Sequence, residues 1–180
     1  MRLGLAFYAR DARVVARSLI GTWLCHGDKH GRIVETEAYL GPTDLASHAR
    51  FGDKGRSRLM FGLAGIAYVY LIYGMHECMN VVTGSDGAGQ AVLIRALEMS
   101  APLPRSDGPG RLTKAMDIGR RHNGQSLLDS DLWIEDRGGP RPKIVTTPRI
   151  GIAYAGAWSE KRWRYVDARS RSLSVKLPAR

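Results

Sequence analysis

The sequence predicts a single α+β domain in which a curved, mostly antiparallel β-sheet packs against a few helices. The clearest signals are the stretches 33–39, 67–73 and 90–98, which are rich in the branched and aromatic residues that favour strands. Turns containing glycine and proline separate the expected strands, and no regular alternation of strands and helices appears. The chain has 180 residues, 44% of them hydrophobic, and contains no internal repeat or linker, so we expect 1–180 to form one domain.

The charge of the chain indicates a polyanionic partner. Lysine and arginine together number 27, against 17 aspartates and glutamates, which gives a formal net charge of +10. Each basic side chain that meets a phosphate releases counterions, so this balance favours nucleic acid. A generic basic surface and a membrane-surface protein are the alternatives, but we find no basic amphipathic helix that would support the second.

Cysteine usage and the N-terminal segment indicate a reducing compartment. Cys25 and Cys78 lie far apart and form no C-x-x-C pair, so neither a disulfide framework nor a structural zinc site is expected. Arginines interrupt residues 1–20, which leaves no apolar run suited to a signal peptide or a membrane span. We therefore expect a cytoplasmic protein with no membrane partner, associated with the nucleoid if the source is bacterial.

The first expected element is a helix that begins after Asp11, a residue type that caps helix N-termini. Gly21 follows it as a stop signal. Apolar side chains recur in it at helical spacing: Ala12, Val15, Ala16 and Leu19. A short strand at 22–26 and a glycine-containing turn at 27–31 then lead into the strand at 33–39, as in a β-hairpin.

The strand at 33–39 carries two glutamates. Alternation divides it into two faces, with Ile33, Glu35, Glu37 and Tyr39 on one and Val34, Thr36 and Ala38 on the other. We expect the second set to face the core. Two like charges on one face repel, so at least one glutamate requires a cation or a buried hydrogen-bonding partner. A solvated strand face and a general acid/base site explain this spacing equally well, and His48 can fold back toward the glutamates through the following loop.

An exposed loop is expected after His48. Its basic residues are available for phosphates, although a solvated loop explains the charge equally well. They are Arg50, Lys54, Arg56 and Arg58.

The strand at 67–73 contains three tyrosines, and each buried hydroxyl requires a partner. Alternation places Tyr68, Tyr70 and Ile72 on one face. A turn at Gly74 leaves Tyr73 and Met75 at an exposed tip, where such side chains suit an enzyme that wedges stacked bases apart. From the residues alone, a core position for this stripe has more support than a functional one.

The strand at 90–98 is expected to return from a hairpin that begins at 79–82. Arg95 interrupts its apolar series, and a buried arginine requires an acidic partner, for which Glu35 and Glu37 are the candidates. The glycine-rich turn between the two strands matches neither nucleotide-binding glycine motif, so no nucleotide cofactor is expected.

The last part of the chain mixes one helix with short strands. A connection at 101–110 leads into a helix at 111–118, and amides at a helix start bind phosphate, which makes Gly110, Arg111 and Lys114 candidate phosphate ligands. Four further strands are expected, at 132–135, 144–147, 150–154 and 164–166, followed by a basic, partly disordered tail at 170–180.

Three long motifs occur in order along the chain: VETEAYLGPTDLASH, YVYLIYGMHECMN and GPGRLTKAM, with weaker similarity through PRIGIAYAGAW. With them the chain resembles the alkyladenine DNA glycosylase family, also called 3-methyladenine or methylpurine-DNA glycosylases, over nearly its whole length. The resemblance implies the same fold and a monofunctional enzyme that flips an alkylated or deaminated purine out of double-stranded DNA. It would hydrolyse the N-glycosidic bond and leave an abasic site for base excision repair. No metal and no cofactor are implied, and we expect a monomer.

The resemblance also implies roles for single residues. Glu37 would activate a water and stabilise positive charge on the sugar, with Arg95 holding both the water and the carboxylate. Asn80 would discriminate against the amino group of guanine, and Tyr73 with Met75 would fill the gap in the duplex. The base pocket would be lined by Tyr39, His48, Tyr70 and Asn80, and phosphates would meet Arg56, Gly110, Arg111 and Lys114.

Three features limit or extend this assignment. The loop at 50–58 departs from the usual Thr-x-Arg-Asn-like element of the family, of which only Arg56 remains, beside Ser57. Backbone near 150–152 is a candidate for placing the water. The motifs contain no lysine placed as a Schiff-base nucleophile, so cleavage of the DNA strand is not expected.

Two interpretations from other classes remain open at this point. A non-catalytic nucleic-acid-binding module would use the basic surface and the tyrosines as a stacking platform, and replacing Glu37 would then have no effect. A metal-dependent hydrolase would use Glu35, Glu37, Asp44 and His48 as ligands, and a chelator would abolish its activity. Neither explains the tyrosine-bearing tip.

Overall fold

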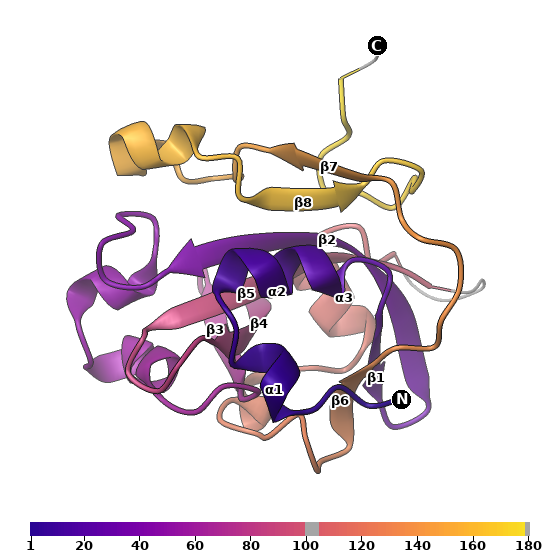
Figure 1. Cartoon of the computed structure of the whole chain (residues 1–180), viewed down its shortest axis with the longest axis horizontal. Helices are drawn as coiled ribbons and strands as arrows, with labels where there is room; N and C mark the ends of the chain where they lie inside the picture. Colours follow the sequence, from indigo (N-terminus) through magenta and orange to yellow (C-terminus); the bar gives the residue numbers. More distant parts are fainter. Residues whose placement is uncertain (100–104, 179–180) are drawn as a thin grey trace.

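The computed structural model describes residues 1–99 and 105–178 and has the α+β architecture that the sequence predicts (Figure 1). One antiparallel sheet of eight strands curls into a half-barrel around the main core. The connection expected at 101–110 lies partly outside the described residues, as does the end of the tail expected at 170–180.

The strands are β1 (Trp23–His26), β2 (Lys29–Leu40), β3 (Ala67–Ile72), β4 (His76–Thr83), β5 (Gln90–Glu98), β6 (Leu132–Glu135), β7 (Ile144–Thr147) and β8 (Arg164–Asp167). Their main order across the sheet is β3, β4, β5, β2, β1 and β6, and neighbouring strands are antiparallel. β8 pairs with part of β2 and with β7, so a C-terminal layer lies along the long central strand (Figure 1).

The helices are α1 (Leu5–Tyr8), α2 (Ala12–Leu19) and α3 (Pro109–Ala115), together with the 3₁₀ helices η1 (His48–Phe51), η2 (Gly55–Phe61), η3 (Arg120–His122) and η4 (Ala153–Glu160). α2 begins at the predicted cap, where the Asp11 carboxylate accepts a hydrogen bond from the Arg13 N–H at 2.9 Å. Its predicted apolar residues are buried, and the Thr36 hydroxyl of β2 donates to the Ala16 carbonyl at 2.8 Å. These contacts hold α2 across β2.

Two irregularities in the pairing of β2 with β5 decide which side chains face the site. Val34 is an extra residue on β2, and Arg95 is an extra residue on β5, as in β-bulges. The predicted alternation is therefore wrong at its start: Ile33 lies in the main core, whereas Val34 packs with Leu173 of the C-terminal segment. The bulge in β5 leaves Arg95 free of the regular ladder, and its side chain turns toward Glu35.

The segment after His48 is more ordered than an exposed loop. It contains η1 and η2, and Ala49, Ser57 and Met60 are buried in it. Ala49 and Met60 pack in one cluster with residues of β3 and β4, and the Ser57 hydroxyl donates to the Gly52 and Lys54 carbonyls. The expectation of a loop is corrected in that respect, although the predicted basic side chains of the segment are exposed.

Two further expectations about secondary structure are wrong in detail. The strand expected at 150–154 is absent from the described chain; Gly151 adopts φ +75°, which interrupts an extended run, and η4 follows. The helix expected at 111–118 lies at Pro109–Ala115: it begins earlier, because proline is well suited to a first helical turn, and it ends before Met116. The other late strands lie where they were expected, with β8 ending at Asp167.

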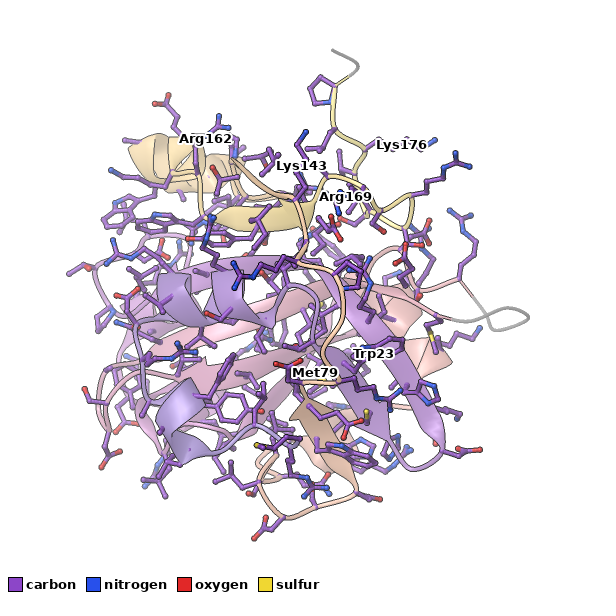
Figure 2. The ribbon with its side chains drawn as sticks, turned by 45° about the vertical axis from the view of Figure 1, so that its right-hand side comes forward. Trp23, Met79, Lys143, Arg162, Arg169 and Lys176 are labelled. Atoms are coloured by element: carbon purple, nitrogen blue, oxygen red, sulfur yellow. The ribbon has the colours of Figure 1, made fainter. Side chains whose placement is uncertain are left out.

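The described residues include no helix that is both long enough and apolar enough to cross a lipid bilayer. Basic side chains extend over the C-terminal layer, where Arg162, Lys143, Arg169 and Lys176 lie around β7, β8 and the final segment (Figure 2). The positive charge of the chain is therefore not confined to one loop.

Candidate active site

A cavity of about 700 Å³ opens beside β3, β4 and β5 and brings together residues from distant parts of the chain. Its lining includes every residue predicted for the base pocket: Tyr39, His48, Tyr70 and Asn80. Arg95 also borders it. The remaining lining combines apolar side chains, such as Met60 and Leu93, with the start of α3. A largely apolar cleft with a few convergent polar groups is the usual form of a small-molecule or base pocket.

The Glu37 carboxylate lies directly behind this lining and has no exposed surface. Its Oε1 accepts a hydrogen bond from the backbone N–H of Ile150 at 2.8 Å. Its Oε2 accepts from the Tyr39 hydroxyl at 2.9 Å and from Arg95 Nη1 at 3.3 Å. All three donors border the cavity. The carboxylate is thus held in one orientation by groups that themselves touch the space where a substrate would lie.

Arg95 has the acidic partners that the sequence predicts for a buried arginine, and it has both of them. Its Nε is 3.0 Å from Glu35 Oε1, and its Nη1 is 3.3 Å from Glu37 Oε2. Burial disfavours the charged guanidinium, but the charges of Glu37 and Glu35 outweigh burial and raise the pKa of Arg95. The arginine therefore stays charged between the two glutamates.

The rest of this buried network has no counterpart among the sequence predictions. Arg164 Nε donates to Glu35 Oε1 at 2.7 Å, and Ser174 donates to Glu35 from its backbone N–H and from its hydroxyl, each at 2.6 Å. The described part of the tail expected at 170–180, residues 170–178, takes part in these contacts. Glu35 and the apolar contacts of Leu173 hold it against β2.

Tyr39 is fixed from its other side by a second buried ion pair. Arg149 stacks over the Tyr39 ring with its guanidinium carbon 4.8 Å from the ring centre. The same guanidinium donates to both carboxylate oxygens of Asp44, at 2.6 and 2.9 Å, and neither side chain is exposed. Burial, followed by the charge of Glu37, raises the pKa of Tyr39 well above its usual value, so its hydroxyl remains a donor.

His48 and two tyrosines form one wall of the cavity. The ring centres of His48 and Tyr70 are 4.6 Å apart with an edge-to-face angle of 68°, and those of Tyr68 and Tyr70 are 5.3 Å apart. His48 Nδ1 lies 2.8 Å from the Tyr68 hydroxyl. Burial, reinforced by the positive charges of Arg56 and Arg50, lowers the pKa of His48 to about 4. His48 is therefore a neutral imidazole at physiological pH.

Asn80 lies on β4 with only 3% of its surface exposed. Its side-chain amide donates to the Tyr68 carbonyl at 3.1 Å, which fixes the orientation of the group at the cavity wall.

Cys78 lies opposite Tyr70 across the β3–β4 pair, and burial raises the pKa of its thiol to about 11. Because that thiol is neutral, it acts as an apolar part of the wall.

Tyr73 and Met75 stand at the tip between β3 and β4, as the sequence predicts. They are 84% and 71% exposed. Tyr73 has φ +53° and Gly74 has φ +69°, and the Met75 N–H donates to the Ile72 carbonyl at 3.2 Å. A tyrosine in the left-handed region is strained, and such strain is typical of functional positions. The turn therefore presents an aromatic side chain to solvent at the mouth of the cavity.

The expected phosphate-binding residues lie on two segments. Arg56 is exposed on η2, and Arg111 and Lys114 are exposed on α3 at the edge of the cavity. Arg111 Nε pairs with Asp107 Oδ1 at 2.8 Å, so its charge is partly neutralised. Gly110 permits the close approach of α3 to β4, because a Cβ at this position would lie 3.1 Å from the His76 side chain.

The carboxylates named as alternative metal ligands are occupied by arginines. Glu35 and Glu37 contact Arg95, and Asp44 is fully paired with Arg149. No group of three or more metal-ligating side chains suited to one ion occurs in residues 1–99 or 105–178. The carboxylates that a metal-dependent hydrolase would use to hold its ion are therefore bonded to the guanidinium groups of Arg95 and Arg149.

Proteins of similar sequence share one family. The family model described as Methylpurine-DNA glycosylase (MPG) matches residues 6–171. A protein of Anaeromyxobacter sp. (strain Fw109-5) named "Putative 3-methyladenine DNA glycosylase" is 53% identical over 171 residues, which cover 92% of this chain and 88% of that protein. Proteins with the same name from Myxococcus xanthus (strain DK1622) and Legionella pneumophila (strain Lens) are 51% identical over 168 residues and 49% identical over 170 residues. These alignments cover 88% of this chain and 86% of the Myxococcus protein, and 91% of this chain and 93% of the Legionella protein.

The match of the family model extends over nearly the whole chain and includes the strands that carry Glu37 and Arg95 and the turn that carries Tyr73. The chain therefore belongs to the methylpurine-DNA glycosylase family, and it is a DNA repair enzyme that hydrolyses the N-glycosyl bond of alkylated purines.

Proposed function

We propose that this chain removes 3-methyladenine from double-stranded DNA with Glu37 as its catalytic carboxylate and Arg95 as the cation that holds it. The observation that carries the proposal is the position of Glu37, which is buried at the back of the cavity and bonded to Ile150, Tyr39 and Arg95. The names of the relatives support the choice of base.

In the proposed reaction, Glu37 takes a proton from a water whose oxygen attacks the anomeric carbon of the nucleotide. The bond from this carbon to the purine nitrogen breaks, and its electron pair leaves with the base. Positive charge develops on the sugar, and a carboxylate close to it stabilises that charge. The products are a free purine and an abasic site. Lysine nucleophiles have no part in this scheme, so strand cleavage does not follow.

The walls of the cavity suit a flipped purine. We propose that Tyr39, His48 and Tyr70 contact the flipped base, with His48 and Tyr70 on the same wall, while Asn80 meets its edge. The edge-to-face contact of His48 with Tyr70 and the bond from Asn80 to the Tyr68 carbonyl support this, because both hold the wall in place before a base enters. A cationic base such as 3-methyladenine is already a good leaving group, whereas neutral hypoxanthine or ethenoadenine depends more on Glu37.

We propose that duplex DNA lies across the tip and the start of α3. Tyr73, with Met75 beside it, would fill the gap that the flipped nucleotide leaves, and Arg56, Arg111, Lys114 and the Gly110 backbone would meet phosphates. The exposure of the tip and the net charge of +10 support this orientation. We further propose that the whole chain works as one monomeric domain in the compartment that holds the genome, the cytoplasm of a bacterium.

Release of 3-methyladenine from methylated duplex DNA tests the proposal. The wild type is expected to release the base with chelator present, and Glu37→Gln is expected to bind the duplex but to release no base above background. Glu160→Gln is the matched control, because this exposed glutamate lies at the end of η4, and it should retain wild-type activity.

The two alternative interpretations give different results. Wild-type protein that binds the duplex tightly but releases no purine would support a non-catalytic binding module. Activity that chelator abolishes would support a metal-dependent hydrolase. Activity in Glu37→Gln equal to that of the wild type would remove Glu37 from the mechanism.

A further inference from the structure

Glu35 is a fully buried carboxylate that the proposed reaction does not use. It lies two positions before Glu37 on β2 and has no exposed surface. Four hydrogen bonds reach it: one from Arg95 Nε at 3.0 Å, one from Arg164 Nε at 2.7 Å, and two from Ser174 at 2.6 Å. So many donors on one carboxylate indicate a fixed anion whose position matters to its neighbours.

The contact between Glu35 and Arg95 determines where Arg95 points. A guanidinium group is planar and rigid, so fixing its Nε edge also fixes the direction of Nη1. Nε is held by Glu35 and lies 3.2 Å from the Ser174 hydroxyl, while Nη1 reaches Glu37. A shift at the first edge therefore moves the group that contacts the catalytic carboxylate.

Arg164 completes the charge balance of this network. Two glutamates and one arginine would leave a net negative charge among buried groups, which is costly. With Arg164, which is only 3% exposed, two carboxylates are matched by two guanidinium groups. Arg164 also donates to the Val175 carbonyl at 2.6 Å, so the compensating cation is itself attached to the C-terminal segment.

We propose that Ser174 is a positioning residue of the glycosylase reaction, which through Glu35 sets the orientation of Arg95 and thereby of Glu37. This inference rests on the proposed function, because it assumes that Glu37 and Arg95 act on the substrate. It makes the segment that follows β8 a part of the active site, which this segment reaches through the contact of Ser174 with Arg95.

A purely structural role for Ser174 has to be separated from a positioning role. Leu173 packs with Val34, Ala96 and Val166, so the segment is also anchored by apolar contacts that Ser174→Ala leaves in place. The alanine variant keeps the backbone N–H that bonds to Glu35 and loses only the hydroxyl. Ser174→Thr restores a hydroxyl at the same position.

The test measures base release from methylated duplex DNA in a single turnover with enzyme in saturating excess. Under these conditions the rate constant reports the folded, bound enzyme and does not depend on the folded fraction. Ser174→Ala is expected to lower this rate constant by about tenfold, since the hydroxyl that is lost donates to Glu35 and accepts from Arg95, both of them charged groups, while duplex affinity changes by less than about twofold. Ser174→Thr should recover most of the rate. Ser172→Ala is the matched control, because Ser172 bonds to Ser170 through its backbone N–H.

A wild-type rate constant in Ser174→Ala overturns the inference, and so does an equal loss in Ser172→Ala or a loss that threonine does not recover. Glu35→Gln supplies a second test, because it changes the carboxylate that connects Ser174 to Arg95. A loss of rate with duplex affinity retained supports the inference, and a wild-type rate overturns it. Failure of the proposed function looks different, because the wild type would then release no base or Glu37→Gln would remain active.

Discussion

The Tyr39 hydroxyl donates a hydrogen bond of 2.9 Å to Glu37 Oε2, although the two residues lie on the same strand only two positions apart. Strand geometry places their side chains on one face, and the stacking of Arg149 on the tyrosine ring holds the phenol in that position. One residue therefore contributes both to the wall of the cavity and to the orientation of the proposed catalytic carboxylate.

Tyr39→Phe separates these two contributions, because phenylalanine keeps the ring and loses the hydroxyl. We expect the single-turnover rate of base release to fall by about tenfold, since one bond to a charged group is lost, with duplex affinity nearly unchanged. Tyr154→Phe is the control, because Tyr154 borders the same cavity but its hydroxyl bonds to the Ala46 carbonyl at 3.3 Å. Equal rates in both variants would contradict a role for the Tyr39 hydroxyl.

Asp44→Asn tests the buried pair beneath Tyr39. Removing the charge leaves Arg149 buried without its carboxylate, which costs about 3–5 kcal/mol of unfolding free energy. For a chain of 180 residues we expect a melting temperature lower by about 10 °C. Asp117→Asn removes the exposed partner of Arg121 and should change the melting temperature little. Thermal unfolding followed by circular dichroism measures both, and similar effects of the two variants would argue against a structural role for the buried pair.

The lowered pKa of His48 predicts a pH dependence of stability. In the unfolded chain His48 takes up a proton as the pH falls below about 6.5, whereas in the folded protein it does so only near 4. The stabilising contribution of neutral His48 is therefore complete above pH 6.5 and is lost as the pH falls from 6.5 toward 4. Urea unfolding at several pH values within this window should show a smaller loss of stability in His48→Gln than in the wild type. Parallel pH profiles of the two proteins would contradict the shift.

Tyr73→Ala tests the exposed tip. Because the side chain is 84% exposed, the unfolding free energy should change by less than about 0.5 kcal/mol. Release of the base from fully paired duplex should fall by about tenfold or more, and release from a lesion that lies opposite a gap should fall less, because no partner base has to be replaced there. Leu63→Ala, which truncates another exposed apolar side chain, should leave both rates unchanged. An equal loss on paired and gapped substrates would rule out a role in filling the duplex.

Much of the fold could be predicted because its signals are local. The cap at Asp11, the strand at β3 and the hairpin from β4 to β5 follow from residue types within a few positions of each other. The bulges are different, since the shift of Val34 depends on how β2 pairs with β5 and not on its own neighbours. The expected strand at 150–154 failed for a related reason: its apolar residues fit a strand, but the backbone turns at Gly151.

Site residues can be predicted from the sequence where a polar side chain interrupts an apolar strand. Arg95 stands out in an apolar strand, and the need for an acid led to Glu35 and Glu37. Arg164 is also buried and lies between two aromatic residues, but its partner Glu35 is 129 positions away, and nothing in the neighbouring sequence indicates it. The Ile150 N–H has no signature in the side-chain sequence, and Ser174 is one serine in a basic segment.

The buried network around Glu35 and Glu37 also affects when, during folding, the active site is completed. Its bonds to Glu37 and Glu35 join residues 58 and 139 positions apart, so it closes long loops, whereas the β3–β4 hairpin closes a short one. Contacts between residues so far apart in sequence form late in folding, because the chain loses entropy on closing a long loop before the contact stabilises it. The return of base-release activity during refolding should therefore report when the C-terminal segment docks on the sheet. We expect this activity to return later than the β-sheet signal.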